Sequence, residues 1–174
     1  KNVRSTTGSL EATATIEDRE YALVLRIPGT FNLSNALCAI LCATAGTGIS
    51  AEQAVRALES FKGVPGRMER IEGGQNFSVF VDFTVTPKSY QATLTTLKSM
   101  LASGKRLLVL CGSCGDRMKA KRPIIGGIVS AHADVMVVTN EDPYTEDPEK
   151  IIDEVIAGVV RTMPIISTQQ QPSA

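Results

Sequence analysis

Short apolar segments that alternate with helical segments constrain the fold of the second part of this chain. Three segments have the length of strands and are rich in Val, Leu or Phe: residues 77–83, 106–111 and 134–139. Each precedes a segment with helical periodicity or helix signals: residues 86–101, 119–132 and 147–159. Strand–helix alternation at this spacing is typical of parallel strands joined by crossover helices. The pattern therefore predicts an α/β domain with a parallel sheet, and we expect the polar tail after Arg161 to fray.

The first part of the chain follows a different pattern. Residues 11–27 predict a hairpin of two strands. Two helices are expected next, one over 32–45 and one that opens with a Ser-x-x-Gln capping box, over 50–60. The Gly- and Pro-rich segment 63–66 then interrupts all periodicity. We therefore expect a domain boundary here, between residues 1–66 and residues 67–174.

The charge balance argues against strongly charged partners. The chain carries 18 acidic and 18 basic side chains, so neither nucleic acid nor a membrane surface is expected to bind it. No apolar run approaches the roughly 18 residues of a membrane span, and the polar start does not resemble a signal peptide. The four cysteines lie in apolar or Gly-rich settings, which indicates a reduced, cytoplasmic protein. Because the chain begins with lysine, we expect it to be part of a longer protein.

Two clusters have weak signals for ligands. Cys111 and Cys114 have the spacing of a redox pair or of half a zinc site, but zinc needs four ligands and the only histidine is His132. We therefore expect no metal site. A basic cluster follows, at Lys119, Lys121 and Arg122. It suits a bound phosphate or carboxylate, although a solvated helix face is the more common explanation.

Polar side chains follow each of the predicted strands. Asp82 ends the first strand, Gly115–Arg117 follows the second, and Asn140–Asp142 follows the third. Because ligands of open parallel sheets gather beyond the carboxyl ends of the strands, these residues predict a site for a polar, charged ligand. The alternative, that Asp82 and Asp142 only cap turns, is equally consistent with the pattern.

Two asparagines lie near the start of the first predicted helix. Asn32 has the position of an N-cap, and such a structural role explains it. Asn35 lies one turn inside the helix, where an N-cap role does not apply. Its amide can both donate and accept a hydrogen bond, which matches the edge of an adenine base.

Five segments occur in the same order in the Mur ligase family, which this chain resembles over about residues 20–160. They are Phe31–Ala36, Gly63–Glu69, Val81–Pro87, Gly115–Pro123 and Glu146–Pro148. The strongest resemblance is to the branch that extends a UDP-N-acetylmuramoyl-dipeptide to a tripeptide. The resemblance implies that residues 1–66 are the end of a central ATP-binding domain, a hairpin plus two helices. Residues 67–174 would be a Rossmann-like C-terminal domain that is incomplete at its end.

The resemblance also implies an activity. It predicts a fragment of an ATP-dependent amide ligase of peptidoglycan synthesis, which joins an amino acid to the muramoyl peptide through an acyl-phosphate. The implied partners are the two substrates and the remainder of the same protein, in the cytoplasm. ATP is the implied nucleotide, and the ligands of Mg²⁺ are expected mainly outside this chain. Two alternatives remain. The chain could be a non-catalytic binding module, or it could belong to another ligase of the superfamily, such as cyanophycin or folylpolyglutamate synthetase.

The family pattern gives individual residues a role. Asn35 would face adenine, and Arg67 and Asp82 would hold the ribose and phosphate region of ATP. Arg117 would bind the carboxylate of the incoming amino acid. The loop after the third strand would contact the side chain of that amino acid through Glu141, Asp142 and Tyr144. No residue of this chain is assigned a catalytic role.

The chain departs from the family pattern in several respects. Val85 stands where the family has a histidine, and Tyr144 stands where diaminopimelate-adding members have an arginine. A Gly-x-x-Gly-Lys-Thr phosphate loop does not occur in the 174 residues. We therefore expect an amino acid other than diaminopimelate, and no turnover of ATP by this chain alone.

Overall fold

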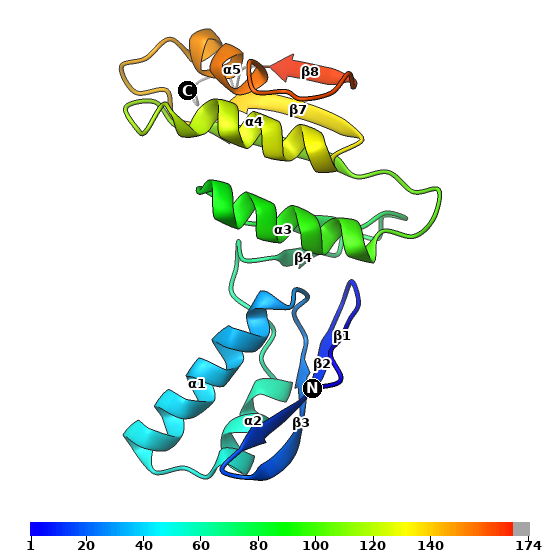
Figure 1. Ribbon diagram of the computed structural model, residues 1–174, viewed down its shortest axis with the longest axis vertical. Coiled ribbons are helices and arrows are strands. Elements are labelled where there is room, and N and C mark those ends of the chain that lie inside the picture. The colour runs from blue at the N-terminus through cyan, green and yellow to red at the C-terminus, as the bar shows by residue number, and fades with distance from the viewer. Residues whose placement is uncertain (169–174) are drawn as a thin grey trace. The chain divides into compact units, whose positions relative to one another are not determined.

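The computed structural model describes residues 1–168, which form two compact units (Figure 1). The first unit is Lys1–Phe83 and the second begins at Thr84. Residues 67–83 form a small hairpin of their own at the end of the first unit. We propose that the domain boundary lies before this hairpin, at residue 66. Among the described residues, no helix is both long and apolar enough to cross a membrane.

An antiparallel sheet and two helices form most of the first unit. The sheet has the order β1 (Arg4–Ser5), β2 (Leu10–Ile16), β3 (Arg19–Leu25), and the helices are α1 (Phe31–Thr47) and α2 (Ala51–Glu59). The turn residues Glu17 and Asp18 both have positive φ, at 47° and 63°, as a two-residue hairpin turn requires. The predicted hairpin and both predicted helices are confirmed.

Buried and more exposed side chains alternate along β2 and β3, and the buried ones form the core of the first unit. Leu10, Leu23 and Leu25 are at most 1% exposed, and they pack with Ile40 of α1 and Val55 of α2. The opposite face of α1 remains open in the described chain, since Leu41 is 57% exposed. The capping box of α2 is confirmed: Ser50 Oγ accepts from Gln53 N at 3.2 Å, and Gln53 Oε1 accepts from Ser50 N at 2.9 Å.

The strand predicted over 77–83 forms a different sheet from the one expected. β5 (Val79–Val81) pairs antiparallel with β4 (Glu69–Ile71) in a two-stranded sheet, so its assignment to the parallel sheet was wrong. The flanking Phe77 and Phe83 are 65% and 62% exposed, so the apolar run does not mark a buried strand. Periodicity alone cannot decide the pairing partner of such a short segment.

The second unit contains a three-stranded parallel sheet. Its order is β6 (Leu108–Ser113), β7 (Val135–Asn140), β8 (Ile165–Thr168), and its helices are α3 (Pro87–Met100), α4 (Lys121–His132) and α5 (Pro148–Ile156). The two strands predicted over 106–111 and 134–139 are confirmed as a parallel pair. The expectation that the tail frays after Arg161 was wrong at β8, which pairs with β7. The remaining tail, and the expected incomplete end of the domain, lie outside the described residues.

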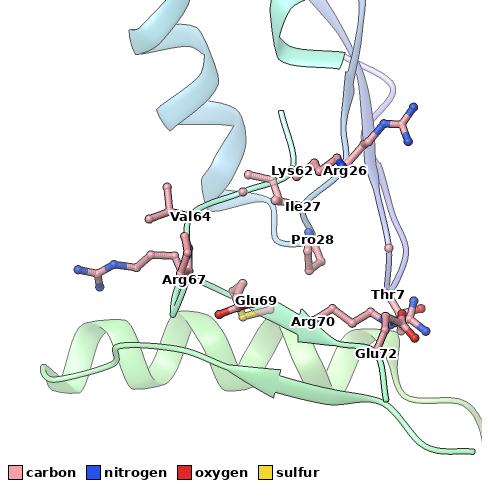
Figure 2. A pocket seen from close by; sticks show the side chains of 14 residues that line it. Thr7, Arg26, Ile27, Pro28, Lys62, Val64, Arg67, Glu69, Arg70 and Glu72 are labelled. Atoms are coloured by element: carbon pink, nitrogen blue, oxygen red, sulfur yellow. The ribbon is translucent and has the colours of Figure 1, made fainter. Parts of the chain in front are cut away.

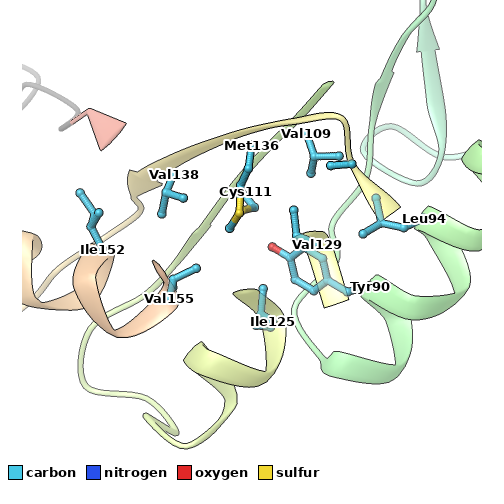
Figure 3. Packing of buried hydrophobic residues seen from close by; sticks show 11 residues of the cluster. Tyr90, Leu94, Val109, Cys111, Ile125, Val129, Met136, Val138, Ile152 and Val155 are labelled. Carbon is cyan, nitrogen blue, oxygen red and sulfur yellow. The ribbon is translucent and has the colours of Figure 1, made fainter. Parts of the chain in front are cut away.

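The core of the second unit lies between the helices and one face of the sheet (Figure 3). Met136 and Val138 of β7 contribute to it together with Val129 of α4 and Val155 of α5. Gly126 lies where α4 meets α5: a Cβ added there would be 1.9 Å from the carbonyl oxygen of Val155. The glycine thus permits the close contact between the two helices.

Candidate functional site

One turn in the first unit brings Arg67 and Asp82 together. Asp82 Oδ2 accepts a hydrogen bond from the backbone N–H of Met68 at 2.7 Å. Arg67 Nη1 donates to the carbonyl oxygen of Phe83 at 2.9 Å, and its guanidinium lies 4.8 Å from the centroid of the Phe83 ring. Two of the three residues predicted to bind ATP therefore lie on the same small hairpin.

Glycine makes this turn possible. Gly66 has a φ of 69°, its N–H donates to Glu69 Oε2 at 2.7 Å, and its carbonyl accepts from Phe83 N at 2.7 Å. Met68 is 2% exposed and has a φ of 49°, so the chain places a buried side chain on a strained backbone between Arg67 and Glu69. Asp82, which accepts the hydrogen bond from the Met68 N–H, therefore helps to fix the turn.

Asn35 is oriented by Asn32. Asn35 Nδ2 donates to Asn32 Oδ1 at 3.1 Å, and Asn32 Nδ2 donates to the carbonyl of Pro28 at 2.7 Å. Asn32 lies inside α1, whose N-cap is Thr30, so the N-cap role predicted for Asn32 was wrong. Asn32 is 8% exposed, whereas Asn35 is exposed. The i, i+3 spacing of the two amides was the sequence signal that could have revealed this pair.

A cavity of about 450 Å³ adjoins the Arg67 turn within the first unit (Figure 2). Its walls come from the β1–β2 turn, the end of β3 and residues of the segment 62–72. Figure 2 shows Arg70 reaching toward Glu72 and Thr7, whereas Arg67 extends away from them. Arg70 Nε is paired with Glu72 Oε1 at 2.8 Å. The cavity therefore has mixed charge, and Arg67 is among the residues that line it.

In the second unit, two loops meet at the carboxyl ends of β6 and β7. The N–H of Gly115 donates to the carbonyl of Asp142 at 2.8 Å. Asp116 accepts from Thr145 twice, at Oδ2 from the backbone N at 3.2 Å and at Oδ1 from Oγ1 at 2.7 Å. A Cβ at Gly115 would lie 1.8 Å from the carbonyl oxygen of Pro143, so only glycine allows the loops to approach so closely.

All four residues predicted to bind the amino acid lie on these two loops. The Arg117 guanidinium lies 5.5 Å from the centroid of the Tyr144 ring, and both side chains are exposed. Glu141 Oε2 accepts from Cys114 Sγ at 2.8 Å. Asp142 contributes its carbonyl to the contact between the loops. The parallel sheet thus brings together the residues that follow its first two strands.

The cysteines beside the loops remain protonated near neutral pH. Burial, followed by the charge of Glu141, raises the pKa of the Cys111 thiol to about 12. Burial and the hydrogen bond to Glu141 also raise the pKa of Cys114. Thiolate is the form that reacts and binds metal. Within residues 1–168, no group of three or more His, Cys, Asp or Glu side chains is placed to hold a metal ion.

Arg122 is buried at the base of these loops, which no pattern in the sequence indicated. Arg122 is 0% exposed, so the solvated face expected for its cluster was wrong at this residue. Nη1 donates to Glu146 Oε2 at 2.9 Å and to Glu154 Oε2 at 2.7 Å, and Nη2 donates to Glu146 Oε1 at 2.9 Å. Lys119 Nζ is paired with Glu146 Oε2 at 2.8 Å. The hydrogen bonds from Arg122 and then Lys119 hold the pKa of Glu146 well below its usual range.

Comparison with known families identifies similar proteins. A family model described as "Mur ligase, glutamate ligase domain" matches residues 66–171. The chain is 39% identical over 158 residues to a UDP-N-acetylmuramyl-tripeptide synthetase of Roseiflexus sp. (strain RS-1), covering 91% of this chain and 30% of that protein. It is also 39% identical over 158 residues to a UDP-N-acetylmuramoyl-L-alanyl-D-glutamate–2,6-diaminopimelate ligase of Clostridium tetani, covering 90% of this chain and 32% of that protein.

The fold is shared with part of longer chains of solved structure. A folylpolyglutamate synthase from Mycobacterium tuberculosis, complexed with ADP and AMPPCP, matches with a TM-score of 0.76 and 20% identity. The match covers 97% of this chain and 37% of that chain. The present chain spans about a third of the length of the relatives that it matches, 30% and 32% for the two proteins above.

Proposed function

The chain belongs to the Mur ligase family, and we propose that it is the part of an ATP-dependent amide ligase that covers the nucleotide and holds the incoming amino acid. The acceptor that we propose is a UDP-N-acetylmuramoyl-dipeptide, which the reaction extends by one amino acid in peptidoglycan synthesis. The similarity to a UDP-N-acetylmuramyl-tripeptide synthetase supports this choice of acceptor. ATP supplies the phosphoryl group that activates the acceptor carboxylate as an acyl-phosphate.

The observation that carries this proposal is the joining of two strand-end loops into one polar surface. The two loops present Arg117, Tyr144 and Glu141, and the backbone of Gly115 is bonded to that of Asp142. A guanidinium binds a carboxylate through two parallel hydrogen bonds. Arg117 therefore suits the α-carboxylate of an amino acid, while Glu141, Asp142 and Tyr144 lie along the same edge of the sheet to contact its side chain.

The nucleotide side of the proposal rests on the first unit. An aspartate suits the two hydroxyls of a ribose, and an exposed arginine suits phosphate oxygens, so we assign these contacts to Asp82 and Arg67. Asn35 would contact the adenine edge, with its amide oriented by Asn32. In this scheme the chain contributes orientation and charge complementarity, which reduce the entropy cost of bringing amine and acyl group together.

Among the described residues, no group of three or more His, Cys, Asp or Glu side chains is placed to hold a metal ion, and no step of the reaction is assigned to a metal held by this chain. The 174 residues also lack a Gly-x-x-Gly-Lys-Thr phosphate loop. We propose that both functions belong to the remainder of a longer cytoplasmic protein. Exposed apolar faces support this view: Leu41 of α1 is 57% exposed, and Leu110 of β6 is 69% exposed although parallel sheets are normally covered on both faces.

Kinetics of the complete protein test these assignments. Asp82→Ala should raise the KM for ATP, and Arg117→Ala should raise the KM for the amino acid, each by about tenfold or more, while the other KM remains within twofold. An unchanged KM for ATP in Asp82→Ala, together with an unchanged kcat, would contradict the nucleotide assignment. Activity with folate or with an aspartate-rich acceptor, but not with the muramoyl dipeptide, would support another ligase of the superfamily.

A further inference from the structure

A buried ion pair between Arg122 and Glu146 lies beneath both loops of the proposed amino-acid site. Arg122, on the first turn of α4, forms a two-pronged contact with Glu146, at 2.9 Å for both hydrogen bonds. The side chains are 0% and 10% exposed. The two parallel bonds fix the carboxylate in direction as well as in position. Glu146 ends the loop that carries Glu141 and Tyr144, so Arg122 holds that loop from below.

Glu146 in turn holds the other loop. Its Oε1 accepts the backbone N–H of Asp116 at 2.7 Å, in addition to the bond from Arg122. The Asp116 carboxylate binds back to Thr145, through both the backbone N and Oγ1. Asp116 and Tyr144 have φ values of 50° and 52°, conformations that a non-glycine residue adopts only when its surroundings impose them. Each loop is therefore held in place by the other, with Glu146 at their junction.

Arg122 also contacts the first loop directly. Its Nη2 donates to the carbonyl of Cys114 at 3.0 Å, and its Nη1 connects the cluster to α5 through Glu154 at 2.7 Å. A lysine has one charged nitrogen and cannot form the planar contact with both oxygens of Glu146 while reaching Cys114. The guanidinium therefore binds the first loop, the second loop and α5 at the same time.

We propose that Arg122 is a positioning residue for the amino-acid site, acting through Glu146 to fix the separation of Arg117 from Glu141 and Tyr144. The ligand in this proposal rests on the proposed function, whereas the coupling between the loops does not. Arg122 itself is buried and does not touch the ligand. When groups that hold a substrate move by about 1 Å, the rate at which that substrate reacts falls by one to two orders of magnitude.

Amide hydrogen exchange on the 174-residue chain tests the coupling without any substrate. In Arg122→Lys and Glu146→Gln, the amides of Gly115, Asp116 and Thr145 should exchange at least tenfold faster than in the unchanged chain. The amides of β7 should keep their protection, which shows that the unit remains folded. The control is Lys119→Gln, which removes an exposed pair to the same Glu146 and should leave the loop amides within about threefold. Unchanged loop amides in both test variants would overturn the proposal.

Steady-state kinetics of the complete protein then test the positioning role. Arg122→Lys should raise the KM for the amino acid about tenfold, with the KM for ATP and kcat within twofold, and Lys119→Gln should match the unchanged enzyme. A fall in kcat with an unchanged amino-acid KM would mean a structural role only and would overturn the proposal. If the unchanged complete protein forms no ADP with any amino acid, the proposed function fails instead. Amide exchange alone then decides whether Arg122 couples the loops.

Discussion

Replacing Asp82 tests the turn on which the nucleotide assignment depends. Asp82→Ala removes the acceptor that lies 2.7 Å from the backbone N–H of Met68. Met68 is 2% exposed, so water cannot readily take the place of the carboxylate. Losing a hydrogen bond to a charged acceptor costs about 1.5–3 kcal/mol.

Amide exchange of Met68 measures this change directly. A loss of about 1.5–3 kcal/mol corresponds to exchange that is roughly 10 to 150 times faster, since about 1.4 kcal/mol is a factor of ten. The control is Asp82→Asn, which keeps an acceptor oxygen of the same reach and should accelerate exchange by about tenfold or less. The reasoning is refuted if the Met68 amide in Asp82→Ala exchanges within twofold of its rate in the unchanged chain. In that case the carboxylate does not fix the turn.

Three further outcomes are expected. Gly126→Ala should destabilise the second unit by about 3 kcal/mol in urea unfolding, because the new Cβ would lie 1.9 Å from a backbone oxygen of α5. Gly46→Ala, which meets no atom within 4 Å inside α1, should instead be neutral or slightly stabilising, and equal effects of the two changes would refute the packing argument. Because the folded state lowers the pKa of Glu146, its stabilising effect is complete above the unfolded pKa of about 4.3 and is lost as the pH falls through the lower folded value. Urea midpoints should therefore fall more steeply on acidification in the unchanged chain than in Glu146→Gln, and parallel pH profiles would contradict this. In the complete enzyme, lysine, ornithine or a neutral amino acid should be preferred to diaminopimelate, because Tyr144 cannot form the paired hydrogen bonds of an arginine with a second carboxylate. A substrate panel led by diaminopimelate would overturn that expectation.

Local signals in the sequence predicted much of the fold. Some features depend mainly on residues that are neighbours in the sequence, and the structure confirms them. They are the Ser50–Gln53 capping box, the hairpin within 11–27 and the strands near 106–111 and 134–139. β8 was missed because only Ile165 and Ile166 are apolar in it, and its order comes from pairing with β7, far away in the sequence. The pairing of β5 with β4 was missed because periodicity alone does not decide which strand so short a segment pairs with.

The sequence predicted the part of the candidate site whose residues come directly after the strands of the parallel sheet. Arg117 and Tyr144 lie together because β6 and β7 are parallel neighbours, which the alternation of strands and helices indicates. Asn32, Arg122 and Glu146 were not assigned to the site. A buried ion pair between residues on a helix and a distant loop leaves no periodic signal, and charged residues are usually exposed. Only the three-dimensional structure shows that Arg122 is 0% exposed.

Formation of ADP by two preparations, the complete protein and residues 1–174 alone, tests the central claim most directly. With ATP, Mg²⁺, a UDP-N-acetylmuramoyl-dipeptide and a panel of amino acids, the complete protein should release ADP only when the acceptor and a suitable amino acid are both present. Residues 1–174 should release none, because the groups that bind the transferred phosphoryl group are missing, and should bind ATP no more tightly than about 1 mM, or roughly −4 kcal/mol. Amino-acid-dependent ADP formation by residues 1–174 alone, or its absence in the complete protein, would contradict the account.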